Sequence, residues 1–166
     1  MNNNTCIVVA DIRLARFYGI EAVESPRLNL KLIERTALTN PNSDLKQLGA
    51  STTGRVHTET NTNRQAGPMH PMGAQRERHR DEFDRRFVQE ISRQAADITK
   101  GWKEGTVVLV AEPRLLGLMR EPLRKAVHQG IELKELAKDY AQFTASELRD
   151  QLASSGIIPP HRVRAQ

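Results

Sequence analysis

Residues 107–120 read VVLVAEPRLLGLMR, a short apolar run followed by a proline and an amphipathic stretch. The run Val107–Ala111 is rich in β-branched residues and too short for a helix, which is typical of a central strand covered on both faces. Pro113 suits the first position of a helix, where its missing N–H costs nothing. The expected buried stripe of that helix is Leu115, Leu116, Met119 and Leu123. A strand that leads directly into a helix predicts an α/β fold.

The N-terminal part predicts an antiparallel meander of three strands. Cys6–Ala10 is a second short apolar run, and a tight turn at 11–14 joins it to a strand at Ala15–Ile20. Leu28–Glu34 alternates apolar and polar residues, as a half-exposed strand does.

A long polar stretch separates the meander from the rest of the chain. From Thr36 to about Gly73, Asn, Thr, Ser, Gly and Pro dominate, with one short helical turn expected at Ser43–Leu48. A connection of this length is functional or disordered, and the composition allows both. From Gln75 to about Lys100, apolar residues recur at helical spacing and predict a long helix that Gly101 ends.

The C-terminal third predicts further helices and one strand. Pro122 interrupts the helical pattern after Pro113 and predicts a kink or two short helices. Ile131–Leu136 is expected to form a strand. Thr144-Ala145-Ser146-Glu147 fits a capping box that opens a helix ending at Ser154.

This order of elements predicts a single mixed β-sheet with packed helices. The chain of 166 residues is long enough to bury a core of its own. We therefore expect one α/β domain over residues 1–154, with a long polar loop at about 50–74. Residues 155–166, which contain two consecutive prolines, are expected to form a flexible C-terminal tail.

Composition limits the classes of function. The net charge of +5 and the pI of about 9.7 favour an anionic partner, although charge for solubility alone explains them equally well. Aromatic residues make up only 4%, so recognition by base stacking is not expected. Cys6 is the only cysteine and lies in an apolar run, which predicts a buried, inert thiol. The N-terminus has neither a secretory signal nor a membrane span, so a cytoplasmic protein without a membrane partner is expected.

No motif predicts a metal ion, a cofactor or a catalytic nucleophile. The histidines lack metal-ligand spacing, and neither a G-x-S-x-G elbow nor a P-loop nor a dinucleotide fingerprint occurs. Asp11 is the only carboxylate at a suitable strand end, and it is expected to be a turn residue. Nuclease chemistry with divalent metals requires clustered carboxylates, so it is not favoured.

Arginines are the more suggestive residues. Arg13 and Arg16 flank the first turn, while Arg114, Arg120 and Arg124 lie at or beyond the end of another strand. If the two strands are parallel neighbours, these side chains could converge and hold phosphates in bidentate fashion. The alternative is that each pairs with a nearby carboxylate or a helix C-terminus. The full set of candidate RNA- or anion-binding residues is Arg13, Arg16, Arg55, Arg76, Arg114, Arg120 and Arg124.

Several segments resemble one family when taken together. They are Val8–Asp11, Ala15–Tyr18, Gly54-Arg55, the helix around Phe83–Phe87, Leu109–Arg120 and Leu136–Tyr140. The most specific piece is A-x-P-R-x-L-G-x-x-R, from Ala111 to Arg120. With these segments the chain resembles the bacterial family named host attachment protein (protein required for attachment to host cells), over nearly its whole length.

That family is similar in turn to the central domain of archaeo-eukaryotic class-1 release factors and Pelota, which implies an RNase H-like sheet. In release factors a Gly-Gly-Gln loop before a long helix promotes peptidyl-tRNA hydrolysis on the ribosome. Gly73-Ala74-Gln75 holds the corresponding place, with Ala74 where the second glycine would stand. The resemblance therefore implies Gln75 as the candidate catalytic residue.

Two functions remain open from the sequence. The first is a translation-associated module that binds RNA or the ribosome, with peptidyl-tRNA hydrolysis as its only candidate enzymatic activity. The second is a host-attachment or interaction factor that acts through protein partners without RNA. The oligomeric state is open as well.

Overall fold

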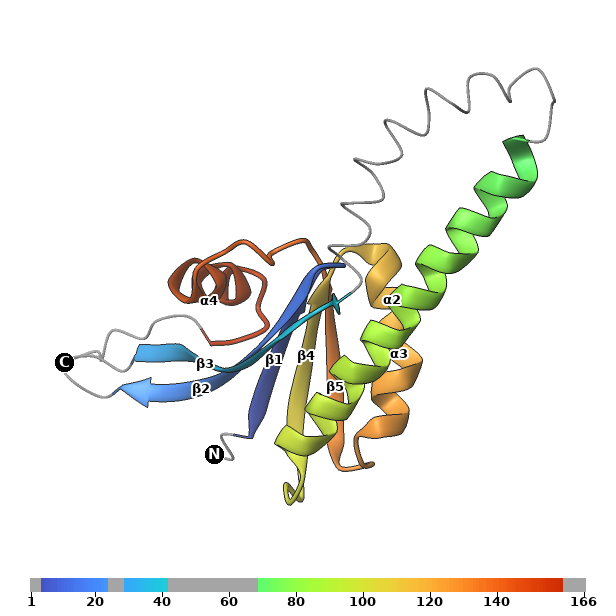
Figure 1. The fold of residues 1–166 in the computed structure, drawn as a ribbon. Helices are drawn as coiled ribbons and strands as arrows, with labels where there is room; N and C mark the ends of the chain where they lie inside the picture. The colour runs from blue at the N-terminus through green and yellow to red at the C-terminus, as the bar shows by residue number, and fades with distance from the viewer. Residues whose placement is uncertain (1–3, 24–28, 42–68, 160–166) are drawn as a thin grey trace.

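The computed structural model describes residues 4–23, 29–41 and 69–159, and within these ranges the side chains of all but Asn29 and residues 69–80. In chain order the elements are β1 (Thr5–Ala10), β2 (Leu14–Val23), β3 (Asn29–Thr39), α2 (Met69–Thr99), β4 (Gly105–Ala111), α3 (Pro113–Ala126), β5 (Ile131–Ala137) and α4 (Ala145–Ser154) (Figure 1).

The strands form one mixed five-stranded sheet in the order β3-β2-β1-β4-β5. β1, β2 and β3 pair antiparallel, as the meander predicted, whereas β4 is parallel to both β1 and β5. Val8 of β1 lies beside Leu109 of β4 in this register. The predicted single mixed sheet with packed helices is confirmed, and β1 and β4 are parallel neighbours.

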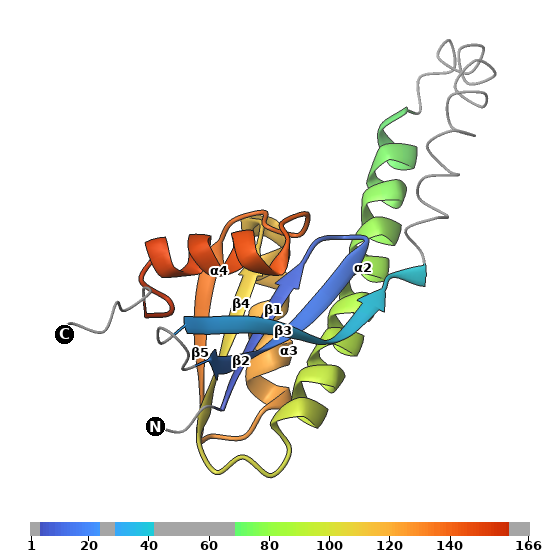
Figure 2. The same cartoon turned by 90° about the vertical axis from the view of Figure 1, so that its left-hand side faces the viewer.

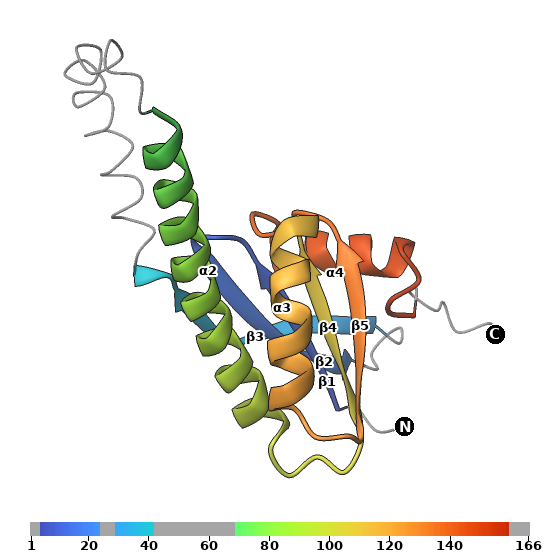
Figure 3. The same ribbon diagram turned by 90° about the vertical axis from the view of Figure 1, so that its right-hand side faces the viewer.

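The apolar runs in β1 and β4 serve two cores at once. Because strand side chains alternate between faces, Val8 and Leu109 enter one buried cluster while Ile7 and Val108 enter the other. α2 and α3 cover the first face (Figure 3), and α4 covers the second (Figure 2). Both strands are therefore buried on both sides, which explains their continuous apolar sequence.

The meander extends further than its side-chain pattern indicated. β2 continues to Val23, and β3 runs to Thr39, past Thr36, where the polar stretch was expected to begin. Thr36–Thr39 pair with Leu14–Phe17, and the register shifts at Arg35. Backbone hydrogen bonds to β2 hold this end of β3, and polar side chains do not reveal such pairing.

α2 begins at Met69, well before the predicted start at Gln75. Pro71 is tolerated in this first turn because backbone N–H groups there have no partner within the helix. Gly73-Ala74-Gln75 is consequently helical. The expectation that a loop presents these three residues ahead of the helix is wrong.

The other two helices follow their sequence signals closely. Glu112 caps α3 by accepting a hydrogen bond from Leu115 N at 2.9 Å, and Pro122 lies inside α3 without dividing it into two helices. In α4 the Thr144 hydroxyl accepts from Glu147 N at 3.2 Å, and the Glu147 carboxylate accepts from Thr144 N at 3.2 Å. The predicted capping box is confirmed.

Packing continues beyond α4. Ile157 N donates to Leu152 O at 3.0 Å, and Ile158 is 4% exposed in the second core, so the chain is packed through Ile158. Most of the predicted tail, residues 160–166, lies outside the described part. The same holds for the short helical turn at Ser43–Leu48, for Arg55 and for most of the predicted polar loop.

Cys6 provides a test of the fold. Burial on the face covered by α2 and α3 raises the pKa of the Cys6 thiol to about 12, so almost none of the thiol is ionised near neutral pH. We expect no reaction of native protein with iodoacetamide at about pH 8 and full reaction after unfolding in denaturant, followed by mass spectrometry. Rapid labelling of the native protein would contradict this packing.

Candidate functional site

The turn after β1 is built around Asp11. Its Oδ1 accepts hydrogen bonds from Arg13 N at 2.7 Å and Leu14 N at 2.9 Å, and its Oδ2 pairs with the Arg13 guanidinium at 3.3 Å. Asn40, at the end of β3, is 1% exposed and donates from its amide side chain to Ile12 O at 2.8 Å. Asp11 is therefore a turn-forming residue, as predicted, and Arg13 is paired with it.

Arg114 connects the β4–α3 corner to α2. Its guanidinium donates to Asp84 Oδ2 at 3.0 Å and also to Asp81 Oδ1. Asp84 is only 1% exposed, so this contact neutralises a carboxylate that lies in the helix interface. The hydrogen bond to Asp84, and then that to Asp81, raises the pKa of Arg114. We call this three-residue contact the α2 clamp.

Arg120 and Arg124, further along α3, are also paired. Arg120 Nε and Nη2 donate to the two carboxylate oxygens of Glu135 on β5 at 2.7 and 2.8 Å. This bidentate contact raises the pKa of Arg120 and lowers that of Glu135. Arg124 lies 3.6 Å from Glu121 on the exposed side of α3.

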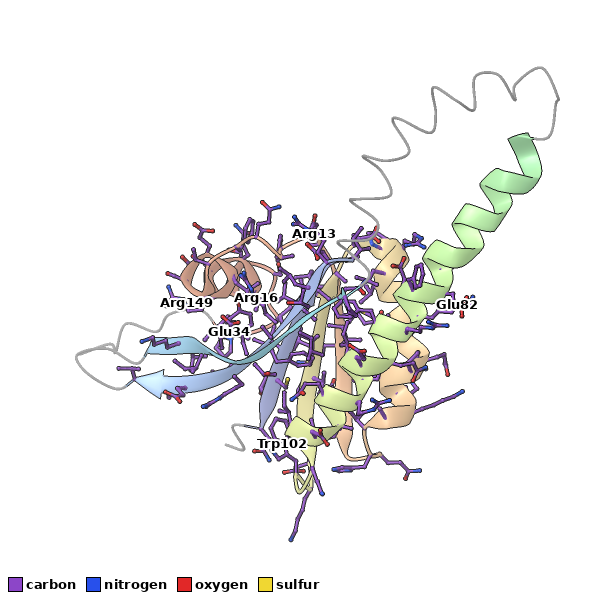
Figure 4. All side chains as sticks on the ribbon, viewed as in Figure 1. Arg13, Arg16, Glu34, Glu82, Trp102 and Arg149 are labelled. Atoms are coloured by element: carbon purple, nitrogen blue, oxygen red, sulfur yellow. The ribbon has the colours of Figure 1, made fainter. Side chains whose placement is uncertain are left out.

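Arg16 lies on the opposite face of the sheet from α3. It stands across from Val9, whose side chain belongs to the α4-side core, and directly opposite residues share a face. Figure 4 accordingly shows Arg16 on the α4 side of the sheet, the side on which Arg149 of α4 also lies. The expected convergence of Arg16 with Arg114 and Arg120 is wrong. Strand alternation places the Arg16 side chain on the α4 face of the sheet, whereas α3, which carries the other two arginines, covers the opposite face.

A groove opens on that second face. It has a volume of about 460 Å³ and lies between β3 and the start of α4, with Lys31 and Arg149 among its polar lining. Arg149 pairs with Asp150 at 2.5 Å.

The remaining predicted residues belong to other parts of the chain. Gln75 and Arg76 lie on the first turns of α2, which stand clear of the sheet in Figures 1 and 3. Within the described residues no group of three or more His, Cys, Asp or Glu could hold a metal ion. No described helix is long and apolar enough to cross a membrane.

Sequence reasoning missed Asp81 and Asp84 as partners of Arg114. A signal was present, because Asp84 falls at helical spacing from Phe87, Val88 and Ile91 on the buried side of α2. A carboxylate at such a position requires a cation or several donors.

The α2 clamp is tested by replacing Arg114→Gln. The change removes the cation from the buried Asp84 carboxylate, and we expect a loss of roughly 1–3 kcal/mol in the free energy of unfolding. The matched control is Arg120→Gln, whose partner Glu135 is accessible to water and whose loss should therefore cost much less. Equal effects of the two substitutions in urea titrations would show that Asp84 does not depend on Arg114.

The Arg120–Glu135 pair makes a separate prediction about pH. Its stabilisation is fully present above the ordinary Glu pKa of 4.5 and is lost as the pH falls through the lowered pKa of Glu135. The stability difference between wild type and Arg120→Gln should therefore be constant near neutral pH and shrink in acid. A difference that stays unchanged in acid would contradict the pairing.

Comparison with known proteins agrees with the resemblance noted from the sequence. A search of the curated proteins gives no match. The sequence profile of the family described as "protein required for attachment to host cells" matches residues 6–152. This range contains the described sheet except Thr5, the first residue of β1, and the described helices except the last two residues of α4. It also contains the α2 clamp. The chain belongs to this host attachment family.

Proposed function

We propose that this protein is a cytoplasmic binding module that engages RNA or the ribosome through the N-terminal part of α2. The observation that carries the proposal is the length of α2 beyond its packed half. The helix begins at Met69, but its first buried side chain among those described is Asp84. Asp81 already contacts Arg114 of α3, so the projecting part is Met69–Arg80, which at 1.5 Å per residue is roughly 18 Å long.

The charge of this projecting part supports an anionic partner. Arg76, Arg78 and Arg80 outnumber the single carboxylate of Glu77 between them. The arginines on the body of the domain are mostly neutralised by carboxylates, as the α2 clamp illustrates. Guanidinium groups bind phosphate in bidentate fashion, so the projecting arginines suit a nucleic-acid backbone.

The resemblance to release factors also supports RNA or the ribosome as the partner. A mixed sheet with helices on both faces is compatible with the RNase H-like sheet that the resemblance implies, and we include this kinship in the proposal. Peptidyl-tRNA hydrolysis by Gln75 has weaker support, because Gly73-Ala74-Gln75 is helical where release factors present a loop. We therefore assign Gln75 to contact with the partner, and Gln75→Ala should weaken binding without abolishing it.

Co-sedimentation with purified ribosomes over a salt series tests the proposal. Binding should weaken with salt, because phosphate contacts release counterions. Arg76→Gln combined with Arg78→Gln should lower the affinity and reduce the slope of log K against log salt by about two, roughly one for each lost contact. The measurement needs only the full chain and ribosomes.

The control removes the same charge from the opposite end of α2. Lys100 and Lys103 are exposed there, and Lys100→Gln combined with Lys103→Gln should leave binding unchanged. Absence of binding at low salt would eliminate the proposal. An equal loss in both double variants would assign the effect to net charge and not to the projecting helix.

The family description favours a second candidate, an interaction factor that acts through protein partners. The same projecting helix could supply that contact. A pull-down from lysate with and without nuclease distinguishes the two, since a ribonucleoprotein partner is lost after nuclease and a protein partner is retained.

A further inference from the structure

β5 is an open edge of the sheet. Among the described strands it pairs only with β4, and it is the last strand in the sheet order. Figure 3 shows β5 at the near edge of the sheet with no described helix in front of it. One row of its backbone N–H and C=O groups is therefore available for pairing with another strand.

The opposite edge of the sheet is different. β3 shifts register at Arg35, and irregularities of this kind twist an edge away from further pairing. The groove between β3 and α4 also shows that α4 lies along part of this strand. The regular edge on which a strand could be added is β5.

Charges on β5 restrict which strand can be added. Glu132 is exposed and Lys134 is half-buried, both on the α4 face, and neither has an ion-pair partner among the described residues. Leu133 is half-buried on the α3 face, where Glu135 is held by Arg120. The strand thus presents one free charge of each sign on either side of a leucine.

These charges are complementary to a second copy in one register. Two identical strands can pair antiparallel about a twofold axis. Opposite residues then lie on the same face of the sheet, so they are separated by an even number of positions in the sequence. The axis therefore lies at one residue, which stands opposite its own copy. An axis through Glu132 or Glu135 sets two glutamates against each other, and one through Lys134 sets two lysines against each other. An axis through Leu133 instead places each Glu132 opposite the partner's Lys134. Axes nearer either end of β5 pair only a few residues.

A hollow lined by both polar and apolar side chains lies beside the same point. It has a volume of about 280 Å³ and lies between the end of α3 and β5, and its lining is Arg124, Val127, His128, Gln129, Ile131 and Leu133. In the Leu133 register the two leucines meet at the axis next to this hollow. Added strands commonly gain affinity from main-chain hydrogen bonds and specificity from such side-chain pockets.

We infer that β5 is a self-pairing edge, on which a second copy of this chain adds its own β5 antiparallel about an axis at Leu133. The dimer joins two sheets into one continuous sheet and forms two reciprocal Glu132–Lys134 ion pairs. The projecting part of α2 takes no part in this pairing, so the dimer neither requires nor excludes the proposed RNA contact.

Charge exchange tests the inference. Sedimentation velocity of the full chain over a concentration series should show a reversible monomer–dimer equilibrium. Lys134→Glu alone, or Glu132→Lys alone, places like charges opposite each other at both pairs and should weaken the dimer roughly tenfold or more. The two single variants should associate when mixed, and the double exchange Glu132→Lys with Lys134→Glu should restore the wild-type dimer.

Cross-linking locates the axis. Opposite residues of an antiparallel pair have Cβ atoms about 4.5–5.5 Å apart, so Leu133→Cys should form a disulfide-linked dimer under mild oxidation. Lys100→Cys, at the far end of α2, should not, and the native Cys6 is buried.

Lys100→Glu makes the same charge change as Lys134→Glu away from the strand edge and should leave the dimer intact. Circular dichroism confirms that each variant is folded. A wild type that stays monomeric at every concentration, single variants that dimerise like wild type, or a mixture that fails to associate would each overturn the inference.

Discussion

The parallel pairing of β1 with β4 is the constraint on which the rest of the structure depends. Two central strands that are buried on both faces require cover on both, so α2 and α3 pack on one face and α4 on the other. The pairing also places the turn after β1 and the β4–α3 corner at the same end of the sheet, where the two central strands finish. At this end of the sheet Asp11 forms the turn after β1, and Glu112 caps α3.

Most arginines in the described body of the domain are paired with carboxylates, and some of these pairs join separate elements. Arg114 joins α3 to α2 across a buried carboxylate, and Arg120 joins α3 to β5. Removing Arg114 would take its cation from the buried Asp84 carboxylate, whereas the second pair is in contact with water. In the proposed function the α2 clamp acts indirectly, since it holds α2 against α3 next to the projecting part.

Two parts of the described structure take no part in these contacts. One is the projecting start of α2, whose sequence has three arginines and one glutamate, and the other is the outer edge of β5, where Glu132 and Lys134 have no ion-pair partner among the described residues. The first suits a partner with a regular negative charge, and the second suits a strand with the complementary order of charges. A dimer through β5 would present two projecting helices, so a partner with repeated phosphates could bind both and gain avidity.

Local patterns were sufficient to predict the mixed sheet, the inert Cys6 and the capping box of α4, because apolar periodicity and helix caps act over a few residues. They failed where distant residues act on each other. The end of β3 is held by hydrogen bonds to β2, the partners of Arg114 come from another helix, and strand alternation separates Arg16 from the arginines of α3. The start of α2 before Gln75 and the single continuous α3 were likewise not evident from local signals. Which charges are neutralised and which stay available depends on contacts between elements, and those exist only once the chain has folded.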